Sequence, residues 1–357
     1  MQTADTLILL CRSGFEGECA AEISELAAAA GYYGYPTLER GSGYVSFHLQ
    51  SPADAKQLVS EIRFRELIFT RQWFACMPGL QDLSPKDRIT PLTEQIAELP
   101  MCAEIVVETP DTTEGRELQG FGRKLASALA PKLRQQGLLM PRKSRAEWRL
   151  HLFILNGRDM FVGVAPVRNS SPWPGGILRL KFPASAPSRS TLKLEEAWHW
   201  FVPRHRWDAE LAAGMTGVDL GAAPGGWTWQ MVKRGMFVTA IDNGPMNEDL
   251  METGQVEHLM EDAFTYQPGK PVDWMVCDVV EKPARTTAMV IDWALNGWSR
   301  NMVFNLKLPM KQRYAEVRNC LERIRTALEE SGVDARLQAK HLYHDREEIT
   351  CWLRVVD

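Results

Sequence analysis

The chain has 357 residues, of which 45% are hydrophobic and 24% are charged, and its formal net charge is −4. These values are typical of a globular protein with about two domains, and the net charge alone does not indicate a nucleic-acid partner. No apolar run approaches the ~18 residues that span a bilayer, and the first residues lack a basic leader with a cleavage site. We therefore expect a cytoplasmic protein without a membrane segment.

Cysteine and histidine usage gives no sign of a metal centre. The seven cysteines are odd in number and scattered, and no two of them form a CxxC pair. This pattern is typical of reduced thiols and differs from a zinc site or a disulfide framework. The seven histidines form no cluster with ligand spacing. The sequence therefore predicts that no metal is bound.

Residues 1–81 alternate short apolar runs with helical patterns and are predicted to form a small α+β subdomain. The predicted elements, in chain order, are a strand at 6–11, a helix at 15–30, a strand at 44–49, a helix from Ser51-Pro52 to about residue 60, and a strand at 67–74.

Residues 82–166 are predicted to form a second part of the front half. The predicted elements are a helix that the Ser84-Pro85 signal introduces, a strand at 103–107, a helix at 116–136, and a hairpin of strands 148–156 and 159–165 with Asn156-Gly157 at its turn. This layout resembles a THUMP domain, which is an RNA-binding module. An accessory oligomerisation domain is the alternative.

Residues 167–189 are predicted to be a basic, proline-rich linker. No acidic residue lies between Asp159 and Glu195, whereas the linker and the stretch before it are rich in arginine and lysine. Such a face either binds phosphates or is a solvated linker. The aromatic residues Trp173 and Phe182 either stack on bases or pin the linker to a domain. The candidate RNA-binding residues are Arg142, Lys143, Arg145, Arg168, Arg179 and Lys181.

Residues 190–357 are predicted to form an α/β domain with a Rossmann-like, mostly parallel sheet covered by helices on both faces. The predicted strands lie at 218–220, 237–241, 256–260, 272–277 and 302–306, with an antiparallel edge of 335–342 and 349–356; the predicted helices lie at 191–201, 227–234, 283–298 and 311–330, the first of them capped by Ser190.

A glycine-rich turn follows the first of these strands, and the rest of the domain is arranged around it. Its spacing is not the GxGxxG of dinucleotide enzymes, and no Gly-Lys-Ser/Thr of a P-loop is present. Pro224 removes an amide donor, so the turn suits a smaller zwitterion such as the methionine part of S-adenosylmethionine. A tight turn without a ligand is the alternative. The candidate cofactor residues here are Gly221, Ala223, Pro224, Gly225 and Gly226.

Acidic residues follow the next three strands. Asp242 is placed to accept hydrogen bonds from ribose hydroxyls, Asp262 to meet an adenine amino group, and Asp278 to lie beside a sulfonium. Each of them alone could be an ordinary turn aspartate, but three in succession beside the glycine turn favour a cofactor site.

Lysine chemistry is the best candidate for catalysis. Residues 277–281 lack the Asp/Asn-Pro-Pro-aromatic stretch of base N-methylation, and neither Cys277 nor Cys351 stands in a Pro-Cys pair. Methylation of a hydroxyl needs a base, and we assign that role to Lys307, with Asp278 orienting it and Lys193 steadying the developing alkoxide. A solvated surface position is the alternative for each lysine.

Motifs over residues 188–352 resemble the Lys-Asp-Lys-Glu signature of the RrmJ/FtsJ-type RNA 2′-O-methyltransferases. They are Ser188-Arg-Ser-Thr-Leu-Lys193-Leu-Glu, Val218-Asp-Leu-Gly-Ala-Ala-Pro-Gly-Gly-Trp227, Cys277-Asp278, Asn305-Leu-Lys307 and Arg346-Glu-Glu-Ile-Thr. With its front half included, the chain resembles the RlmM-type family of bacterial 23S ribosomal RNA cytidine 2′-O-methyltransferases.

The resemblance implies S-adenosylmethionine as methyl donor, a cytidine ribose as acceptor, and 23S ribosomal RNA or a ribosome-assembly precursor as partner of a monomer. It places Ser190 beside the cofactor together with the turn and the three aspartates. The signature glutamate is either Glu347 or Glu348. Two other functions stay open: a methyltransferase for a small-molecule hydroxyl, and a non-catalytic RNA-binding protein with this fold.

Overall fold

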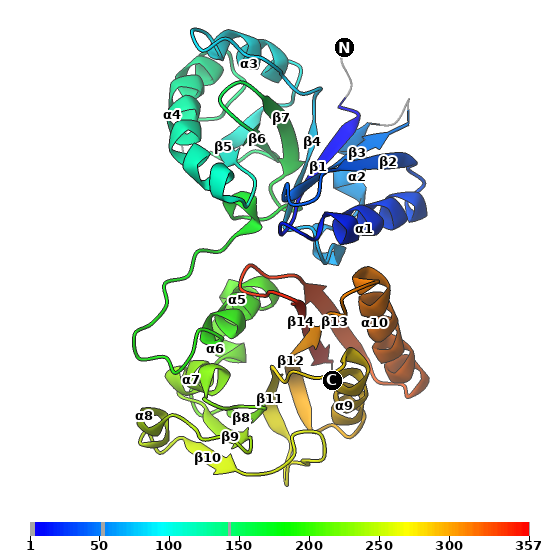
Figure 1. Ribbon diagram of the computed structural model, residues 1–357, viewed down its shortest axis with the longest axis vertical. Coiled ribbons are helices and arrows are strands. Elements are labelled where there is room, and N and C mark those ends of the chain that lie inside the picture. Colours follow the sequence, from blue (N-terminus) through cyan, green and yellow to red (C-terminus); the bar gives the residue numbers. More distant parts are fainter. Residues whose placement is uncertain (1–3, 51–53, 142–143, 357) are drawn as a thin grey trace. The chain divides into compact units, whose positions relative to one another are not determined.

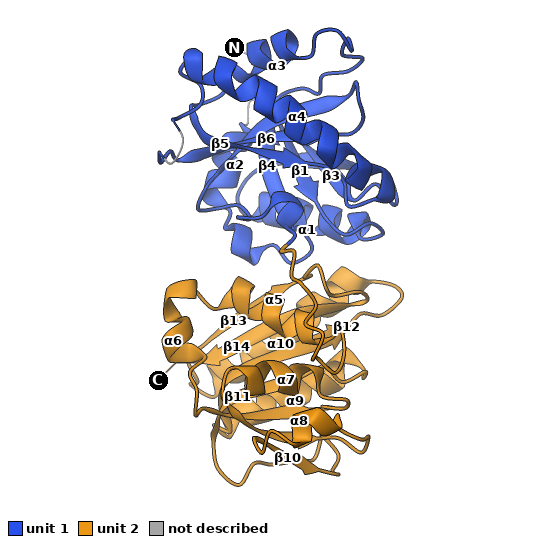
Figure 2. Cartoon of the chain, turned by 90° about the vertical axis from the view of Figure 1, so that its left-hand side faces the viewer, with its two compact units in different colours: residues 1–177 blue, residues 178–357 orange. Residues whose placement is uncertain are grey.

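The computed structural model describes residues 4–50, 54–141 and 144–356, and the chain divides between Ile177 and Leu178 into two compact units (Figures 1 and 2). Each unit is built on one seven-stranded sheet. Within the described residues, no helix is long and apolar enough to cross a membrane. All seven cysteines lie in the described ranges, where each is buried and none forms a disulfide.

Unit 1 has its strands in the order β2-β3-β1-β4-β7-β6-β5. Only β5 and β6 run parallel to each other; the other neighbouring pairs are antiparallel. The strands are β1 (Thr6–Leu10), β2 (Gly34–Leu38), β3 (Tyr44–Leu49), β4 (Gln72–Cys76), β5 (Cys102–Glu108), β6 (Trp148–Ile154) and β7 (Met160–Pro166).

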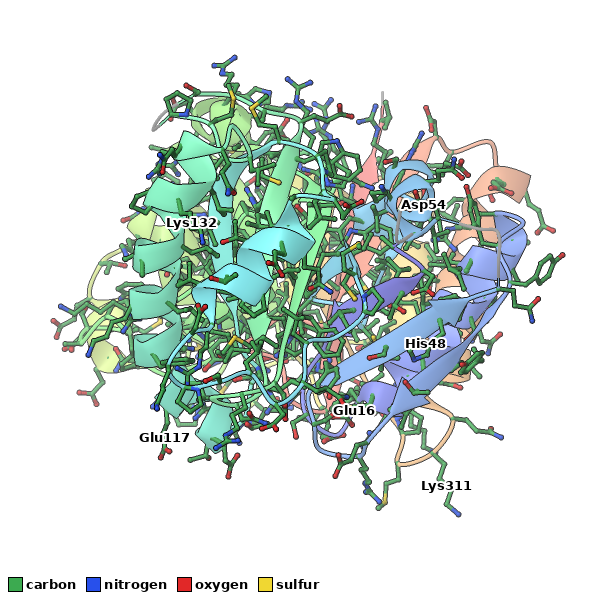
Figure 3. The ribbon with its side chains drawn as sticks, turned by 90° about the horizontal axis from the view of Figure 1, so that it is seen from above. Glu16, His48, Asp54, Glu117, Lys132 and Lys311 are labelled. Atoms are coloured by element: carbon green, nitrogen blue, oxygen red, sulfur yellow. The ribbon has the colours of Figure 1, made fainter. Side chains whose placement is uncertain are left out.

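The helices of unit 1 are α1 (Glu16–Ala29), α2 (Ala55–Glu61), α3 (Ile89–Ile96) and α4 (Thr113–Gln135). Glu117 and Lys132 mark α4 in Figure 3. The Thr112 hydroxyl caps α4 by accepting a hydrogen bond from Gly115 N at 3.1 Å. Gly122 lets α4 approach β5 closely, because a Cβ there would lie 2.5 Å from a Val107 methyl group.

Several predicted elements of unit 1 begin later than expected. The strand predicted at 67–74 is β4, because a 3₁₀ turn at Phe64–Glu66 occupies the approach to it. The helix after Ser84-Pro85 starts only at Ile89. Strand β2 was not predicted, because Pro36 and exposed side chains obscure its pattern at the sheet edge. Ser51-Pro52 lies outside the described residues.

Residues 167–177 of the predicted linker are bound to unit 1. The Ser171 carbonyl accepts hydrogen bonds from Arg149 Nη1 at 2.6 Å and from Gln72 Nε2 at 3.1 Å. Gly175 N donates to the buried Glu108 carboxylate. A Cβ on Gly176 would overlap the backbone of Arg71. The segment therefore fits against unit 1 because its polar groups pair with otherwise unsatisfied buried ones.

Unit 2 has its strands in the order β10-β9-β8-β11-β12-β14-β13. The first five strands are mutually parallel, and β14 is antiparallel to both of its neighbours. The strands are β8 (Thr216–Leu220), β9 (Phe237–Ile241), β10 (Val256–Leu259), β11 (Val272–Cys277), β12 (Ser299–Lys307), β13 (Ala335–Lys340) and β14 (Glu348–Val355).

Helices cover both faces of this sheet, with α5 and α7 on one side and α9 and α10 on the other (Figure 1). The helices are α5 (Thr191–Phe201), α6 (Trp207–Glu210), α7 (Gly226–Lys233), α8 (Glu248–Met251), α9 (Pro283–Leu295) and α10 (Arg313–Glu330). The core under α5 includes the edge-to-face pair Trp198 and Trp274, whose ring centroids are 6.0 Å apart. The predicted Rossmann-like α/β fold is confirmed.

Candidate active site

The predicted site residues of unit 2 gather where the parallel strands end. Parallel strands present their carboxyl ends at one edge of a sheet, and in open α/β sheets ligands bind outside that edge. Gly221 follows β8, Asp242 follows β9, and Asp278 follows β11, while Lys307 is the last residue of β12. The sheet order places β8, β11 and β12 side by side. Residues far apart in the sequence are thus neighbours at one edge.

The glycine turn leaves no room for side chains at two of its positions. Gly221 has φ +77°, and a Cβ there would overlap Val279 Cγ2. A Cβ on Gly226 would overlap the hydroxyls of Ser188 and Ser190. The Ala223-Pro224 peptide bond inside the turn is cis. Side chains at these positions would force the turn or its neighbours to shift, and α7 begins directly after the turn.

Asp219, on β8, ties the strand to the helix after the turn. Its carboxylate accepts a hydrogen bond from Thr228 Oγ1 at 2.7 Å. Burial raises the pKa of Asp219 to about 7. Asp219 thus connects β8 and α7, the two elements that flank the turn.

Ser190 does not cap α5 with its side chain, as the sequence had predicted. Its backbone is helical (φ −61°, ψ −21°), and its side chain makes no capping hydrogen bond. Its hydroxyl instead lies 2.6 Å from the Ser188 hydroxyl, and its carbonyl accepts a hydrogen bond from Trp227 Nε1 at 2.9 Å. The prediction of a cap was therefore wrong, but the residue does lie against Gly226 of the turn.

Asp242 shapes the turn from the next strand. Its two carboxylate oxygens accept hydrogen bonds from Ala223 N at 3.0 Å and from Gly244 N at 2.7 Å. Asp262 lies further along the edge, where it accepts a hydrogen bond from Phe264 N at 2.9 Å and is 3.7 Å from Arg285 Nη2. Among the described residues, no hydrogen bond or ion pair joins Asp262 to the turn. Asp262 therefore remains a candidate by its strand-end position alone.

Two lysines reach one carboxylate from different elements. Lys193 Nζ, from α5, lies 3.1 Å from Asp278 Oδ2, and Lys307 Nζ, from β12, lies 2.7 Å from Asp278 Oδ1. Glu348, at the start of β14, lies 2.6 Å from Lys193 Nζ and 3.6 Å from Lys307 Nζ. Each of these side chains is 10–18% exposed, so the cluster is enclosed yet open to a reactant. We call these four residues the lysine cluster.

The opposite charges in the lysine cluster stabilise the ionised forms of Lys193 and Asp278. Burial by itself would lower the pKa of the Lys193 ammonium, but Asp278 and Glu348 outweigh that effect and raise it. Burial would raise the pKa of the Asp278 carboxyl, but Lys193 and Lys307 together lower it. Asp278 is therefore an anion and Lys193 a cation at neutral pH.

Glu347 and Glu348 point in different directions. Glu348 is buried in the lysine cluster, whereas Glu347 is 61% exposed and pairs with Arg313 Nη2 at 2.8 Å. Of the two candidates for the signature glutamate, only Glu348 contacts both lysines. Cys277, next to Asp278, is fully buried, and burial raises its pKa to about 12. A thiolate nucleophile is therefore not available at this position.

Two residues behind Asp278 carried no predicted role. Asn305 Nδ2 donates to Asp278 Oδ1 at 2.7 Å, and Thr350 Oγ1 lies 2.8 Å from Asn305 Oδ1. Asn305 stands two residues before Lys307, so strand alternation places both side chains on one face. Both residues lie within the motifs quoted above, Asn305-Leu-Lys307 and Arg346-Glu-Glu-Ile-Thr, but the sequence analysis assigned a role only to the lysine and the glutamates of those motifs.

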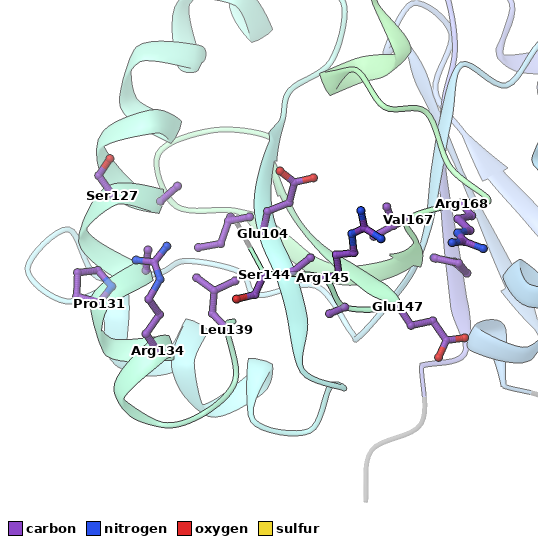
Figure 4. A pocket seen from close by; sticks show the side chains of 16 residues that line it. Glu104, Ser127, Pro131, Arg134, Leu139, Ser144, Arg145, Glu147, Val167 and Arg168 are labelled. Atoms are coloured by element: carbon purple, nitrogen blue, oxygen red, sulfur yellow. The ribbon is translucent and has the colours of Figure 1, made fainter. Parts of the chain in front are cut away.

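Unit 1 contains a groove with a volume of about 1220 Å³ beside α4 and β5 (Figure 4). Arg134, Arg145 and Arg168 are spread along it, and Ile105 and Leu139 are among its apolar lining residues. Two of the predicted RNA-binding residues, Arg145 and Arg168, are thus exposed on one groove. Arg179 and Lys181 are exposed on the segment that opens unit 2, and Arg142 and Lys143 lie outside the described residues.

Comparison with known proteins decides the family. A protein from Cellvibrio japonicus (strain Ueda107), named ribosomal RNA large subunit methyltransferase M, is 53% identical over 349 residues, covering 98% of this chain and 99% of its own. A Pseudomonas putida (strain GB-1) protein of the same name is 53% identical over 353 residues, covering 99% of both chains. The chain belongs to this family.

Family models agree with this membership along the chain. The RlmM ferredoxin-like domain matches residues 4–74, the N-terminal model of ribosomal RNA large subunit methyltransferase M matches residues 87–166, and the FtsJ-like methyltransferase model matches residues 186–317. Among solved structures, an Aeropyrum pernix fibrillarin crystallised with S-adenosyl-L-methionine has a TM-score of 0.33 and 12% identity, over 59% of this chain and 85% of that one. A score this low supports no assignment.

Proposed function

We propose that the protein transfers a methyl group from S-adenosylmethionine to the 2′-hydroxyl of a cytidine in 23S ribosomal RNA. Membership of the ribosomal RNA large subunit methyltransferase M family supports a ribosomal RNA substrate. One observation carries the chemistry: the ammonium groups of Lys193 and Lys307 meet on the carboxylate of Asp278 at the ligand-binding edge of the sheet. That arrangement suits a hydroxyl acceptor, since it can both remove a proton and steady the resulting negative charge.

The glycine turn and its neighbours fit the proposed cofactor. A Cβ at Gly221 or Gly226 would overlap Val279 or the hydroxyls of Ser188 and Ser190, so glycine is needed to keep the turn in this shape at the sheet edge. The turn leads into the N-terminus of α7, where amide groups favour a carboxylate. The remaining lone pairs of Asp242 can accept hydrogen bonds from ribose hydroxyls. The bound cofactor would supply an electrophilic methyl group on a sulfonium, and Asp278 lies on the strand end where that positive charge would be favoured.

Lys307 acts as the general base in this proposal. In its neutral form Lys307 would accept the proton of the 2′-hydroxyl while the oxygen forms a bond to the methyl carbon. The bond from that carbon to sulfur would break, and S-adenosylhomocysteine would leave with the bonding electron pair. Asp278 orients Lys307 through the 2.7 Å contact. Once Lys307 has accepted the proton, the negative charge of Asp278 stabilises the resulting ammonium group. Lys193 stays protonated, because Asp278 and Glu348 raise its pKa, and so it can hold the hydroxyl and steady the developing alkoxide.

The front half binds the RNA in this proposal. Residues 82–166 form the THUMP-like part, and the groove beside α4 offers arginine side chains for phosphates and apolar walls for bases. Arg179 and Lys181 are two further exposed basic residues, in the segment of the chain that leads into the catalytic half. Arg149, although part of the same basic run, is buried and pairs with Glu104 at 3.0 Å, so its role is structural.

Transfer of labelled methyl groups onto ribosomal RNA tests the proposal. The wild-type protein is expected to label 23S RNA, free or in an assembly precursor, whereas Lys307→Ala loses about a hundredfold or more of the rate, as removal of a general base predicts. Cofactor affinity, measured by calorimetry, should persist in Lys307→Ala. Lys311→Ala is the matched control, because Lys311 is an exposed lysine four positions further along the chain.

The outcomes separate the proposal from its two rivals. A methyltransferase for small-molecule hydroxyls would leave ribosomal RNA unlabelled. A non-catalytic RNA-binding protein would bind RNA without labelling it even as wild type. Resistance of the labelled nucleotide to alkaline cleavage shows whether the methyl group is on the ribose oxygen, and a label on the base would refute the hydroxyl chemistry.

A further inference from the structure

A line of buried polar groups runs away from the lysine cluster into unit 2. Asn305 of β12 and Thr350 of β14 are paired across the two antiparallel strands. Thr350 Oγ1 lies 2.8 Å from Asn305 Oδ1 and 3.0 Å from both carboxylate oxygens of Asp345, in the loop before β14. All three residues are at most 1% exposed. The line therefore connects Asp278 to a carboxyl group that solvent does not reach.

The direction of these hydrogen bonds follows from the donors and acceptors available. The Asp278 carboxylate can only accept, so the amide nitrogen of Asn305 must face it and the amide oxygen must face Thr350. Thr350 then donates its single hydroxyl proton to Asn305 Oδ1. The 3.0 Å contact between Thr350 and Asp345 is consequently a hydrogen bond only if Asp345 donates, which requires a protonated carboxyl.

The surroundings of Asp345 favour that protonated form. One of its oxygens, Oδ2, accepts a hydrogen bond from Leu342 N at 2.9 Å, and the other, Oδ1, lies 3.0 Å from Thr350 Oγ1. The charged groups acting on Asp345 are Glu348, at the start of β14, and Lys193 and Glu196, both on α5. Burial raises the pKa of Asp345 well above its ordinary value, and the carboxylate of Glu348 adds to this effect.

We propose that Asp345, Thr350 and Asn305 are positioning residues that hold the Asp278 carboxylate in the one orientation in which it meets both Lys193 and Lys307. Asp345 donates to Thr350, Thr350 donates to Asn305, and Asn305 donates to Asp278 Oδ1. None of the three touches a reactant. The inference rests on the proposed function, since it assigns these residues to the methyl-transfer site.

The relay acts on the same oxygen of Asp278 that Lys307 contacts. Asn305 and Lys307 both donate to Asp278 Oδ1, at 2.7 Å each, so Asn305 helps to fix the position of the oxygen that Lys307 meets. Without Asn305 in place, the Asp278 carboxylate would lose one of the contacts that set its orientation toward Lys307.

Thr350→Val is the direct test, because valine keeps the shape of the side chain and lacks the hydroxyl. We expect kcat to fall about tenfold, the effect of one hydrogen bond to a charged network, with little change in KM for RNA or cofactor. Thr350→Ser restores the hydroxyl and should recover most of kcat.

Thr287→Val controls for the loss of a buried threonine hydroxyl elsewhere. Thr287, on α9, is 0% exposed like Thr350, and no hydrogen bond between described residues joins its hydroxyl to the lysine cluster. Thr287→Val should keep kcat close to the wild-type value. An equal loss of kcat in Thr287→Val, or no recovery of kcat in Thr350→Ser, would show that Thr350 has only a structural role and would overturn the proposal.

Asp345→Asn and Asp345→Ala test the protonated carboxyl. Asparagine supplies an amide donor for Thr350 and an acceptor for Leu342 N, so this variant should keep most of kcat, whereas alanine should lose about tenfold. A loss in Asp345→Asn as large as in Asp345→Ala would mean that the negative charge of Asp345 is what matters and would refute the relay. Unfolding temperatures of both variants exclude global unfolding as the cause.

Nuclear magnetic resonance separates failure of the relay from failure of the proposed function. The Asn305 side-chain amide protons should exchange slowly in wild type and in Thr350→Ser, and faster in Thr350→Val. This measurement needs no RNA and no methyl transfer. A protein that shows protected Asn305 protons but never labels RNA would refute the proposed function alone, whereas unprotected Asn305 protons in an active wild type would refute the relay alone.

Discussion

Glu347 and Glu348 are adjacent in the chain, yet only one of them belongs to the lysine cluster. Successive side chains of a strand point to opposite faces, and β14 begins at Glu348 in register with Lys307 of β12. Glu348 therefore faces Lys193 and Lys307, while Glu347 turns outward to Arg313. The sequence motif left this choice open, because both residues are glutamate.

Glu348→Gln is expected to lower the methyl-transfer rate, and Glu347→Gln is not. The first change removes the carboxylate that lies 2.6 Å from Lys193 Nζ, and the loss of one charge-assisted hydrogen bond corresponds to about a tenfold effect. The second change removes only an exposed ion pair, which contributes about 1 kcal/mol or less to stability. Steady-state rates of both variants on ribosomal RNA decide the matter; equal losses would contradict the assignment of Glu348.

At the scale of elements, the turn between β8 and α7 depends on a left-handed backbone conformation at Gly221, which residues with a side chain rarely adopt. Gly221 has φ +77° and would overlap Val279 if it carried a Cβ. Gly214 also has a positive φ, +83°, but a Cβ there would meet nothing within 4 Å. The two glycines therefore share the conformational requirement and differ only in the space around them.

Gly221→Ala should weaken cofactor binding, and Gly214→Ala should serve as its control. Both variants are expected to lose about 1 kcal/mol of stability from the left-handed backbone. Only Gly221→Ala must displace Val279 and the turn, so we expect its cofactor affinity to drop by about tenfold or more. Calorimetric titration with S-adenosylmethionine and thermal unfolding measure the two effects. Wild-type affinity in Gly221→Ala would contradict a cofactor site at this turn.

The elements that the sequence predicts well are those with strong local signals. The strands Phe237–Ile241 and Val272–Cys277 and the helix Thr191–Phe201 have the predicted bounds, since each is an apolar run between clear breaks. The short helices α6 and α8 were missed, because four residues are too few for a periodic pattern.

The candidate site was predictable only in part, because local sequence patterns place residues at strand ends but do not set the register between distant strands. Lysines and aspartates at strand ends could be expected to meet, because parallel strands end at one edge. The contact of Asn305 with Thr350, 45 residues later, is set by the register of β12 and β14, which no local pattern specifies.

At the scale of the whole molecule, the two units carry different parts of the proposed function. Unit 1 offers the groove with Arg145 and Arg168, and unit 2 holds the lysine cluster. The net charge of the chain, −4, does not reveal the basic groove, because acidic residues elsewhere in the chain outnumber the arginines and lysines. Arg149 lies in the same basic stretch of the sequence, but folding buries it.

Reversal of charge in the groove should weaken RNA binding by the full-length protein. For Arg145→Glu combined with Arg168→Glu, we expect the dependence of affinity on salt to flatten by about one unit of slope per lost phosphate contact. Arg123→Glu is the control, because Arg123 is exposed on α4 but outside the groove lining. Fluorescence titrations at several salt concentrations measure the slope. An effect of Arg123→Glu as large, per residue, as that of the groove variants would mean that overall charge, not the groove, attracts the RNA.

The position of β14 in the sheet determines when the lysine cluster can exist. β14 lies between β12 and β13, both of which precede it in the chain, and it carries Glu348, Thr350 and the pairing that fixes Asn305. During synthesis, Lys307 emerges from the ribosome some forty residues before the strand that completes its surroundings. A nascent chain therefore has the lysine proposed as general base but no assembled site, and a premature stop before Glu348 would leave β12 as an open edge. Under the proposed function, methyl transfer becomes possible only after this strand has been translated and inserted.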